Sequence, residues 1–184
     1  MNRLKFFVES IKNIKSTGTV TKSSQVLCRN MIKHIDFSTA KCIIELGAGD
    51  GVITEHILKA MHPDAKLIAF EVYPPFWEIL EKIDDPRFIL VKESAEYIQK
   101  HLDIHGFEKA DYIVSGLPIV NLPKELGYKI VQAAHDNLKE GGVYSQFHYS
   151  LLAKKIYESV FGNVKMQLVP LNIPPAIVMR SVKE

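Results

Sequence analysis

The sequence has few cysteines and no long apolar run. Its 184 residues include only Cys28 and Cys42, whose spacing is not the C-x-x-C of a metal or redox site. No stretch approaches the roughly 18 apolar residues that a membrane-spanning helix needs. Linkers rich in Pro, Gly or Ser, internal repeats, low-complexity blocks and a secretory leader are also missing. These absences predict a cytoplasmic protein with a single domain over residues 1–184.

Charge is distributed unevenly along the chain, although the formal net charge is only +2. Residues 1–41 hold eight Lys or Arg and two acidic residues, whereas the remainder holds 15 basic and 19 acidic residues. A basic N-terminal part on a mildly acidic body favours an anionic partner, either a membrane surface or a nucleic acid. A solvated basic face without any partner is the simpler alternative.

Short apolar runs alternate with longer segments of helical periodicity after residue 40, which predicts a doubly wound, Rossmann-like α/β fold. Successive residues within these runs are apolar, so both faces of each strand are apolar, which indicates a sheet that is covered on both faces. Strands are expected at 41–46, 66–71, 87–91, 111–115, 142–149, 165–170 and 176–180. Helices are expected at 54–61, 75–83, 95–102, 123–138 and 151–160.

The segment before the first strand, residues 1–38, is expected to form a basic amphipathic helix and a cover for a bound cofactor. Leu4, Phe7, Val8, Ile11 and Ile14 recur at helical spacing, with basic residues mostly on the other faces. Such a helix can lie in a membrane interface, or it can simply pack on the domain. The stretch 18–24, GTVTKSS, ends this helix, and a second helix is expected to run from there to His34.

The strongest chemical signal is the segment 45–51, ELGAGDG, at a predicted strand-to-helix turn. Open α/β sheets bind ligands at this position. Gly47 and Gly49 allow unusual backbone angles and close approach of a ligand. The acid Glu45 before the loop suits a cationic ligand better than a pyrophosphate. Glu71 ends the next strand, where a carboxylate can accept hydrogen bonds from both hydroxyls of a ribose.

ELGAGDG followed by FEVYP (70–74) resembles motifs one and two of the class I S-adenosylmethionine (SAM) methyltransferases. The resemblance extends from about Gly18 to the C-terminus and implies a seven-stranded, mostly parallel sheet with an antiparallel last strand. It implies SAM as the cofactor and Glu71 as the ribose ligand. The segment KESAEYI (92–98) matches the position that contacts the adenine edge. The remaining cofactor-binding residues implied are Thr19, Glu45, Gly47, Ala48, Gly49, Val72, Tyr73, Ser94 and Ala95.

The segment 115–118, SGLP, resembles the N-[LIP]-P-[YF] motif of enzymes that methylate amino groups. The resemblance implies that Ser115, Gly116, Leu117 and Pro118 form the catalytic segment, in which backbone carbonyls and the Ser115 side chain orient the acceptor amine. Pro118 restricts the backbone around Leu117 and so holds these groups rigidly. Ile119 stands where relatives that methylate adenine have an aromatic ring, which counts against a base as the acceptor.

The N-terminal part also resembles that of bacterial phospholipid N-methyltransferases, in which a GTV-x-x-SS segment covers the cofactor and the leading helix binds membrane. Together these resemblances imply a SAM-dependent N-methyltransferase whose acceptor is the amine of a phosphatidylethanolamine-type lipid. They also imply peripheral contact with an anionic membrane at its inner face. The alternatives are an RNA adenine methyltransferase, a small-molecule amine methyltransferase and a non-catalytic SAM-binding module. No His or Cys spacing suggests a metal site.

Overall fold

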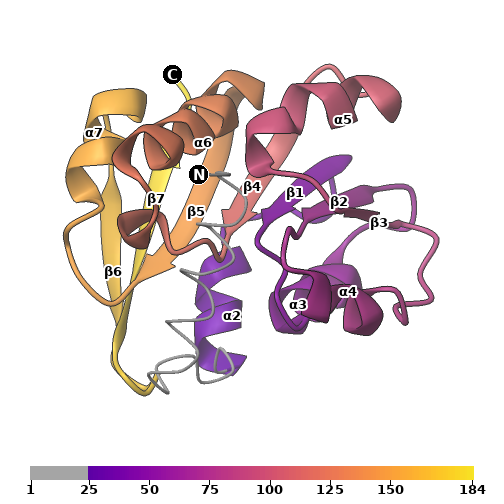
Figure 1. Ribbon diagram of the computed structural model, residues 1–184, viewed down its shortest axis with the longest axis horizontal. Coiled ribbons are helices and arrows are strands. Elements are labelled where there is room, and N and C mark those ends of the chain that lie inside the picture. Colours follow the sequence, from indigo (N-terminus) through magenta and orange to yellow (C-terminus); the bar gives the residue numbers. More distant parts are fainter. Residues whose placement is uncertain (1–24) are drawn as a thin grey trace.

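The computed structural model describes residues 25–184, in which seven strands form one sheet in the order β3-β2-β1-β4-β5-β7-β6 (Figure 1). The pairs among β1 to β5 are all parallel, whereas β7 runs antiparallel to both β5 and β6. The predicted sheet with its antiparallel last strand is therefore confirmed. The strands are β1 (Cys42–Leu46), β2 (Lys66–Phe70), β3 (Phe88–Val91), β4 (Ala110–Ser115), β5 (Leu138–His148), β6 (Lys165–Val169) and β7 (Ala176–Val182).

Helices cover both faces of the sheet, as the two-sided apolar strands require. Apolar residues of α5, α6 and α7 pack with one set of strand residues, including Ile44 and Ile113. Those of α2 and α3 pack on the other face, around Ile43 and Val114. The helices are α2 (Gln25–Ile32), α3 (Val52–Ala60), α4 (Pro74–Leu80), α5 (Ile98–Ile104), α6 (Lys124–Asn137) and α7 (Lys154–Phe161), with short 3₁₀ turns η1 (Ala95–Tyr97) and η2 (Ile119–Asn121).

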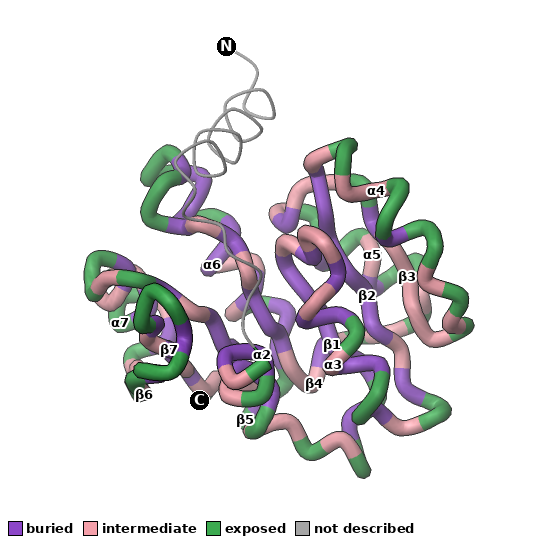
Figure 2. Tube along the Cα trace, turned by 90° about the horizontal axis from the view of Figure 1, so that it is seen from below, coloured by how far each residue is buried: buried purple, intermediate pink, exposed green. Residues whose placement is uncertain are grey.

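The core lies in the two layers between the sheet and its helices. In Figure 2 the central strands are buried along most of their length, and exposed residues gather on turns and outer helix faces. All five residues of β1 are buried, including Glu45. An acidic residue in a fully buried strand indicates a structural or functional role, because burial disfavours its ionised form. Within the described residues, no helix is long and apolar enough to cross a membrane.

The element boundaries differ from the expected ones mainly at two places. Strand β5 begins at Leu138, four residues early, because Leu138 pairs with Ala110 before an irregularity restores the pairing of Val143 with Tyr112. Gly141 makes this irregularity possible with a φ of 75°, which residues other than glycine rarely adopt. The expected helix 95–102 divides into the 3₁₀ turn η1 and the α-helix α5.

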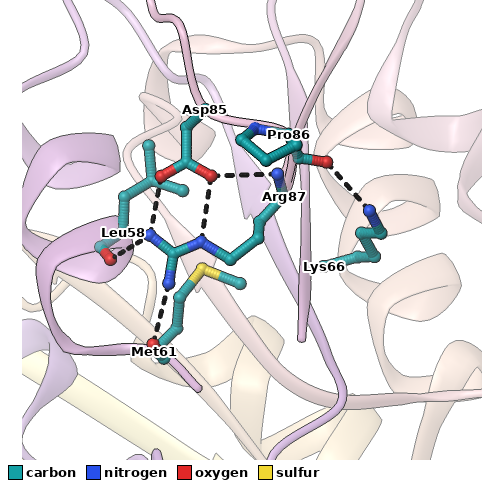
Figure 3. Close-up of polar contacts among 6 residues, drawn as sticks. All are labelled: Leu58, Met61, Lys66, Asp85, Pro86 and Arg87. Atoms are coloured by element: carbon teal, nitrogen blue, oxygen red, sulfur yellow. Dashed lines mark hydrogen bonds and ion pairs between the residues drawn. The ribbon is translucent and has the colours of Figure 1, made fainter. Parts of the chain in front are cut away.

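Arg87 ties the edge of the sheet to the end of α3 (Figure 3). Its guanidinium donates to the carbonyls of Leu58 and Met61 at 2.8 and 2.9 Å, so it satisfies carbonyl groups in the last turn of the helix. Asp85 accepts two further bonds from the same guanidinium, at 2.9 and 2.6 Å. These bonds keep the pKa of Asp85 below its ordinary value. The contact fixes α3, whose N-terminus follows the glycine loop.

Candidate active site

The glycine loop lies between the ends of β1, β2 and β4. The N–H groups of Gly47 and Ala48 both donate to the carbonyl of Phe70, at 2.8 and 3.1 Å, which holds the loop against the end of β2. Gly47 has a φ of 75°, and a Cβ added there would lie 2.6 Å from Cδ2 of Leu117. The positive φ favours glycine at this position, and the Leu117 side chain of the SGLP segment packs directly against it.

Glu71 lies at the end of β2 with its carboxylate turned toward the glycine loop. One oxygen, Oε2, accepts from the N–H of Gly49 at 2.8 Å, and Oε1 accepts from the N–H of Tyr73 at 2.7 Å. The side chain is only 3% exposed. The indole of Trp77 donates to the Glu71 carbonyl at 2.9 Å, so the backbone here is held as well. Each carboxylate oxygen can accept more than one hydrogen bond, as a site for ligand hydroxyls requires.

Glu45 lies beneath the glycine loop and is 1% exposed. Its Oε2 accepts from the hydroxyl of Thr54 on α3 at 2.6 Å, whereas Oε1 has no hydrogen-bond partner among the described residues. Burial raises the pKa of this carboxyl to about 8, and the nearby Glu71 and Asp50 charges act in the same direction. A buried acid without a full set of partners next to a glycine loop is the arrangement expected where a cationic ligand binds.

A cavity of about 490 Å³ opens at this edge of the sheet. It brings together six of the residues predicted to bind the cofactor or the acceptor, from the ends of β1 to β4. Its lining contains three acidic residues, Glu71, Glu93 and Glu96, and one basic residue, Lys92, an excess that favours a positively charged ligand. The predicted residues in its lining are Gly47, Glu71, Val72, Ser94, Ala95 and Leu117.

Sequence reasoning missed several residues of this cavity. Phe70 was not predicted to bind the cofactor, and within the segment 92–97 only Ser94 and Ala95 were. Ser94 caps the 3₁₀ turn by accepting from the N–H of Glu96 at 3.4 Å. That S-x-E pattern was the available signal. Leu126 and Ile130 complete the lining from α6. Their i, i+4 apolar spacing is that of ordinary core residues and carries no chemical signal.

The SGLP segment begins at the last residue of β4 and is tightly packed. The hydroxyl of Ser115, which is fully buried, accepts from the N–H of Leu117 at 3.3 Å. Gly116 donates to the Leu46 carbonyl at 2.8 Å, and a Cβ there would lie 2.9 Å from the Gly47 carbonyl oxygen. Of the four residues, only Leu117 lines the cavity, and Pro118 follows with φ −79° and ψ 64° in a tight turn.

A buried polar network, which sequence reasoning did not find, holds the Leu117 carbonyl. Nε2 of Gln146 on β5 donates to this carbonyl at 2.5 Å, and the N–H of Ile119 donates to it at 2.9 Å. The hydroxyl of Tyr144 donates in turn to Oε1 of Gln146. Gln146 is opposite Ser115 in the sheet register and is fully buried. The network therefore fixes the orientation of the carbonyl at the wall of the cavity.

His148 lies at the end of β5. Its Nε2 is 2.8 Å from the hydroxyl of Tyr157 on α7, and its side chain is buried. Burial lowers the pKa of His148 to about 4, so the ring is neutral near pH 7. Tyr157 and Tyr144 are also buried, which raises the pKa of both phenols above the ordinary value. None of the three titrates near neutrality.

The other predicted residues lie around the cavity or outside the described part. Ala48 and Gly49 belong to the glycine loop, and Gly49 contributes its N–H to Glu71. Tyr73 contributes a backbone N–H, and its ring contacts Phe76 with centroids 5.5 Å apart. Thr19, the segment 18–24 and the amphipathic helix expected at the N-terminus lie outside the described residues. Within residues 25–184, no group of three or more His, Cys, Asp or Glu side chains could hold a metal ion.

The residues present fit SAM. A cationic ligand suits the acidic cavity and the buried Oε1 of Glu45, and ribose hydroxyls suit the carboxylate of Glu71. The glycine loop is open at Gly49, where an added Cβ would meet none of the described atoms beyond its chain neighbours within 4 Å. The fold agrees with solved methyltransferases. One is the 1,6-didemethyltoxoflavin-N1-methyltransferase of Burkholderia thailandensis, with a TM-score of 0.71, 14% identity and coverage of 98% of this chain and 86% of that one. At that identity the likeness shows the fold alone.

Comparison of sequences defines the family more closely. The ornithine lipid N-methyltransferase of Singulisphaera acidiphila is 31% identical over 97% of this chain and 96% of its own length. The ribosomal RNA small subunit methyltransferase H of Christiangramia forsetii is 30% identical, but only over 48% of this chain and 29% of its own. No protein-family model matches the chain.

The sheet order, the site and these relatives define a class I SAM-dependent methyltransferase. The predicted enzyme class and cofactor are thereby confirmed. Within that class, the chain belongs to the family that contains the ornithine lipid N-methyltransferase of Singulisphaera acidiphila.

Proposed function

We propose that this enzyme methylates the amine of an amino lipid. The main support is the similarity to the ornithine lipid N-methyltransferase, which extends over nearly the whole of both chains. Ornithine lipids and phosphatidylethanolamine-type phospholipids both carry an amine in the polar headgroup, so one site can accept either chemistry. The SGLP segment is consistent with this acceptor, since Ile119 offers no ring on which a base could stack.

The protein would contribute to the reaction by aligning the acceptor amine with the methyl group of the cofactor. SAM, when bound, supplies a methyl group that its positively charged sulfur activates. Glu71 and the glycine loop would hold the ribose and the methionine part, with Val72, Tyr73, Ser94 and Ala95 around the adenine. The amine must meet the methyl carbon in line with the carbon–sulfur bond that breaks, and holding this orientation can supply a large part of the acceleration.

The backbone of the SGLP segment would orient the amine. The Leu117 carbonyl already accepts from Gln146 and Ile119, and no described residue outside regular strand pairing donates to the Gly116 carbonyl. The Gly116 carbonyl is part of the peptide bond to Leu117, the one residue of the segment that lines the cavity, and is therefore the favoured acceptor for an amine N–H. A protonated amine must first lose a proton to expose its lone pair. The proton would pass to bulk solvent before the amine attacks, because Ser115 and His148 are both buried and Nε2 of His148 is engaged with the Tyr157 hydroxyl at 2.8 Å.

The N-terminal part would complete the enzyme. We propose that residues 1–38 belong to the same domain, with Thr19 and the segment 18–24 over the cofactor. The basic amphipathic helix expected within residues 1–15 would contact anionic lipid, with the protein peripheral at the inner face of the membrane. Deleting residues 2–15 should then reduce methyl transfer to vesicles strongly while leaving SAM affinity nearly unchanged. Equal transfer by the truncated protein would contradict this role.

An RNA acceptor is the second candidate, because part of the chain is similar to ribosomal RNA methyltransferases. The test is methyl transfer from labelled SAM to a total lipid extract and to total RNA in parallel. We expect label in amino lipids only. Label in RNA, with affinity that falls steeply as salt rises, would replace the lipid proposal with the RNA one.

A further inference from the structure

In the turn between β6 and β7, the polar side chain is buried and its apolar neighbours are exposed. Asn172 is 2% exposed, while its neighbours Leu171 and Ile173 are 75% and 81% exposed. The Asn172 amide donates to the Pro174 carbonyl at 2.7 Å, and its backbone N–H donates to the Val169 carbonyl at 3.3 Å. The turn is therefore held from inside by its polar residue, and it presents two large aliphatic side chains outward.

The loop after β5 presents a second pair of apolar residues. Leu151 and Leu152 are 55% and 78% exposed, and Tyr149 is 44% exposed. A side-chain hydrogen bond between Tyr149 and Asn172 links this loop to the β6–β7 turn. Val120, in the turn that follows SGLP, is also 43% exposed. We call the exposed residues of these three connections the apolar rim: Val120, Tyr149, Leu151, Leu152, Leu171 and Ile173.

The rim lies at the same edge of the sheet as the cavity. β4, β5 and β6 are parallel, so the connections that follow them all lie at their carboxyl ends, as do the glycine loop and Glu71. The β6–β7 turn projects at the bottom of Figure 1, and α5 lies at the top, at the other end of the sheet. A substrate that enters the cavity from the carboxyl edge therefore passes near the rim.

The three connections of the rim, residues 116–123, 149–153 and 170–175, contain no charged side chain. Charges begin at the starts of α6 and α7, where Lys124, Lys154 and Lys155 outnumber Glu125 and Glu158, and Lys154 pairs with Glu158 at 3.1 Å. Exposed aliphatic and aromatic side chains with no charge among them, next to a small excess of lysines, suit an anionic lipid surface, where apolar groups enter the acyl boundary and ammonium groups remain among the headgroups.

We propose that the apolar rim inserts into an anionic lipid surface and brings the mouth of the cavity to the headgroups. This inference rests on the proposed function, since a lipid acceptor gives the contact its purpose. It concerns residues separate from the N-terminal helix, so the protein would contact the membrane at two places. Insertion would let the headgroup amine of a lipid reach the SGLP segment while the lipid stays in the bilayer.

Single-cysteine labelling tests insertion directly. Cys28 and Cys42 are the only cysteines and both are buried, so a water-soluble, polarity-sensitive dye would react at an introduced surface cysteine. Leu171→Cys carries the dye on the rim, and Ile104→Cys, whose native residue is 60% exposed at the far end of α5, is the control. With phosphatidylcholine–phosphatidylglycerol vesicles, dye emission should shift to the blue at residue 171 only. No shift at residue 171, or equal shifts at both, overturns the proposal.

Binding and turnover give a second readout. Leu152→Ser combined with Leu171→Ser should weaken vesicle binding by about tenfold or more, because two exposed aliphatic groups no longer enter the lipid. Ile104→Ser should not weaken it. Methylation of a water-soluble, short-chain amino lipid should be equal in all variants, which shows that the site is intact. Unchanged vesicle binding by the double variant overturns the rim proposal, whereas absence of lipid methylation by the unaltered enzyme overturns the proposed function instead.

Discussion

Replacing Glu71 with glutamine tests the cofactor site most closely, because the shape of the side chain is kept and the charge is lost. Both carboxylate oxygens accept backbone N–H groups, from Gly49 at 2.8 Å and Tyr73 at 2.7 Å. Glutamine has one acceptor oxygen, so its NH₂ group would face one of these donors. A buried N–H left without a partner costs about 1–3 kcal/mol, which should appear as a lower free energy of unfolding.

SAM affinity should fall as well in Glu71→Gln. Hydrogen bonds to a charged group are worth about 1.5–3 kcal/mol, which corresponds to a roughly 10- to 150-fold higher dissociation constant. Isothermal titration with SAM and with its demethylated product measures this change. Glu93→Gln is the matched control, because Glu93 also lines the cavity but directs its carboxylate to Lys100 and His101. Equal SAM affinity in Glu71→Gln and the unaltered enzyme would refute the assignment.

Three further substitutions test other parts of the site. Gly47→Val should abolish SAM binding in titration and lower the melting temperature, since its Cβ would lie 2.6 Å from Cδ2 of Leu117 at a φ of 75°; normal binding would contradict the tight loop. Gln146→Leu should lower kcat about tenfold or more at unchanged SAM affinity, because the Leu117 carbonyl loses the donor that holds it, and with it the neighbouring Gly116 carbonyl, in place; an unchanged kcat would refute that role. The pKa of Glu45 is about 8 in the folded protein, above its value of 4.5 in the unfolded chain. The contribution of Glu45 to the free energy of unfolding is therefore complete below pH 4.5 and is lost as pH rises to 8. Glu45→Gln should remove this decline from denaturant titrations across that range, and an unchanged decline would show that Glu45 is not its source.

Local sequence patterns predicted most of the fold and the positions of the glycine loop and of Glu71, whose contacts with the cofactor stay a prediction. Buried strands and glycine turns have strong local patterns, so β1 with its glycine loop and β2 with Glu71 could be located from residue type and spacing alone. The antiparallel last strand came from the family resemblance. Its position beside β5 depends on long-range pairing, which no local pattern encodes.

The acceptor side could not be predicted to the same depth. Gln146 is 29 residues from Leu117 in the sequence, and only the pairing of β4 with β5 brings the two together. The burial of Asn172 in the β6–β7 turn also has no local signature, because Asn in a turn between strands is ordinarily exposed. Such features arise from tertiary contacts, which become visible once the strands are aligned.

Methyl transfer to a defined amino lipid tests the central claim most directly. Vesicles that contain an ornithine lipid or phosphatidylethanolamine would be incubated with the enzyme and labelled SAM, with the same lipid acetylated at its amine as the matched control. Mass spectrometry of the products would locate each added methyl group. We expect N-methylated product from at least one of the amino lipids and none from the acetylated lipids. Labelling of RNA alone, or equal labelling of the acetylated and free lipids, would contradict the assignment of this enzyme as a lipid N-methyltransferase.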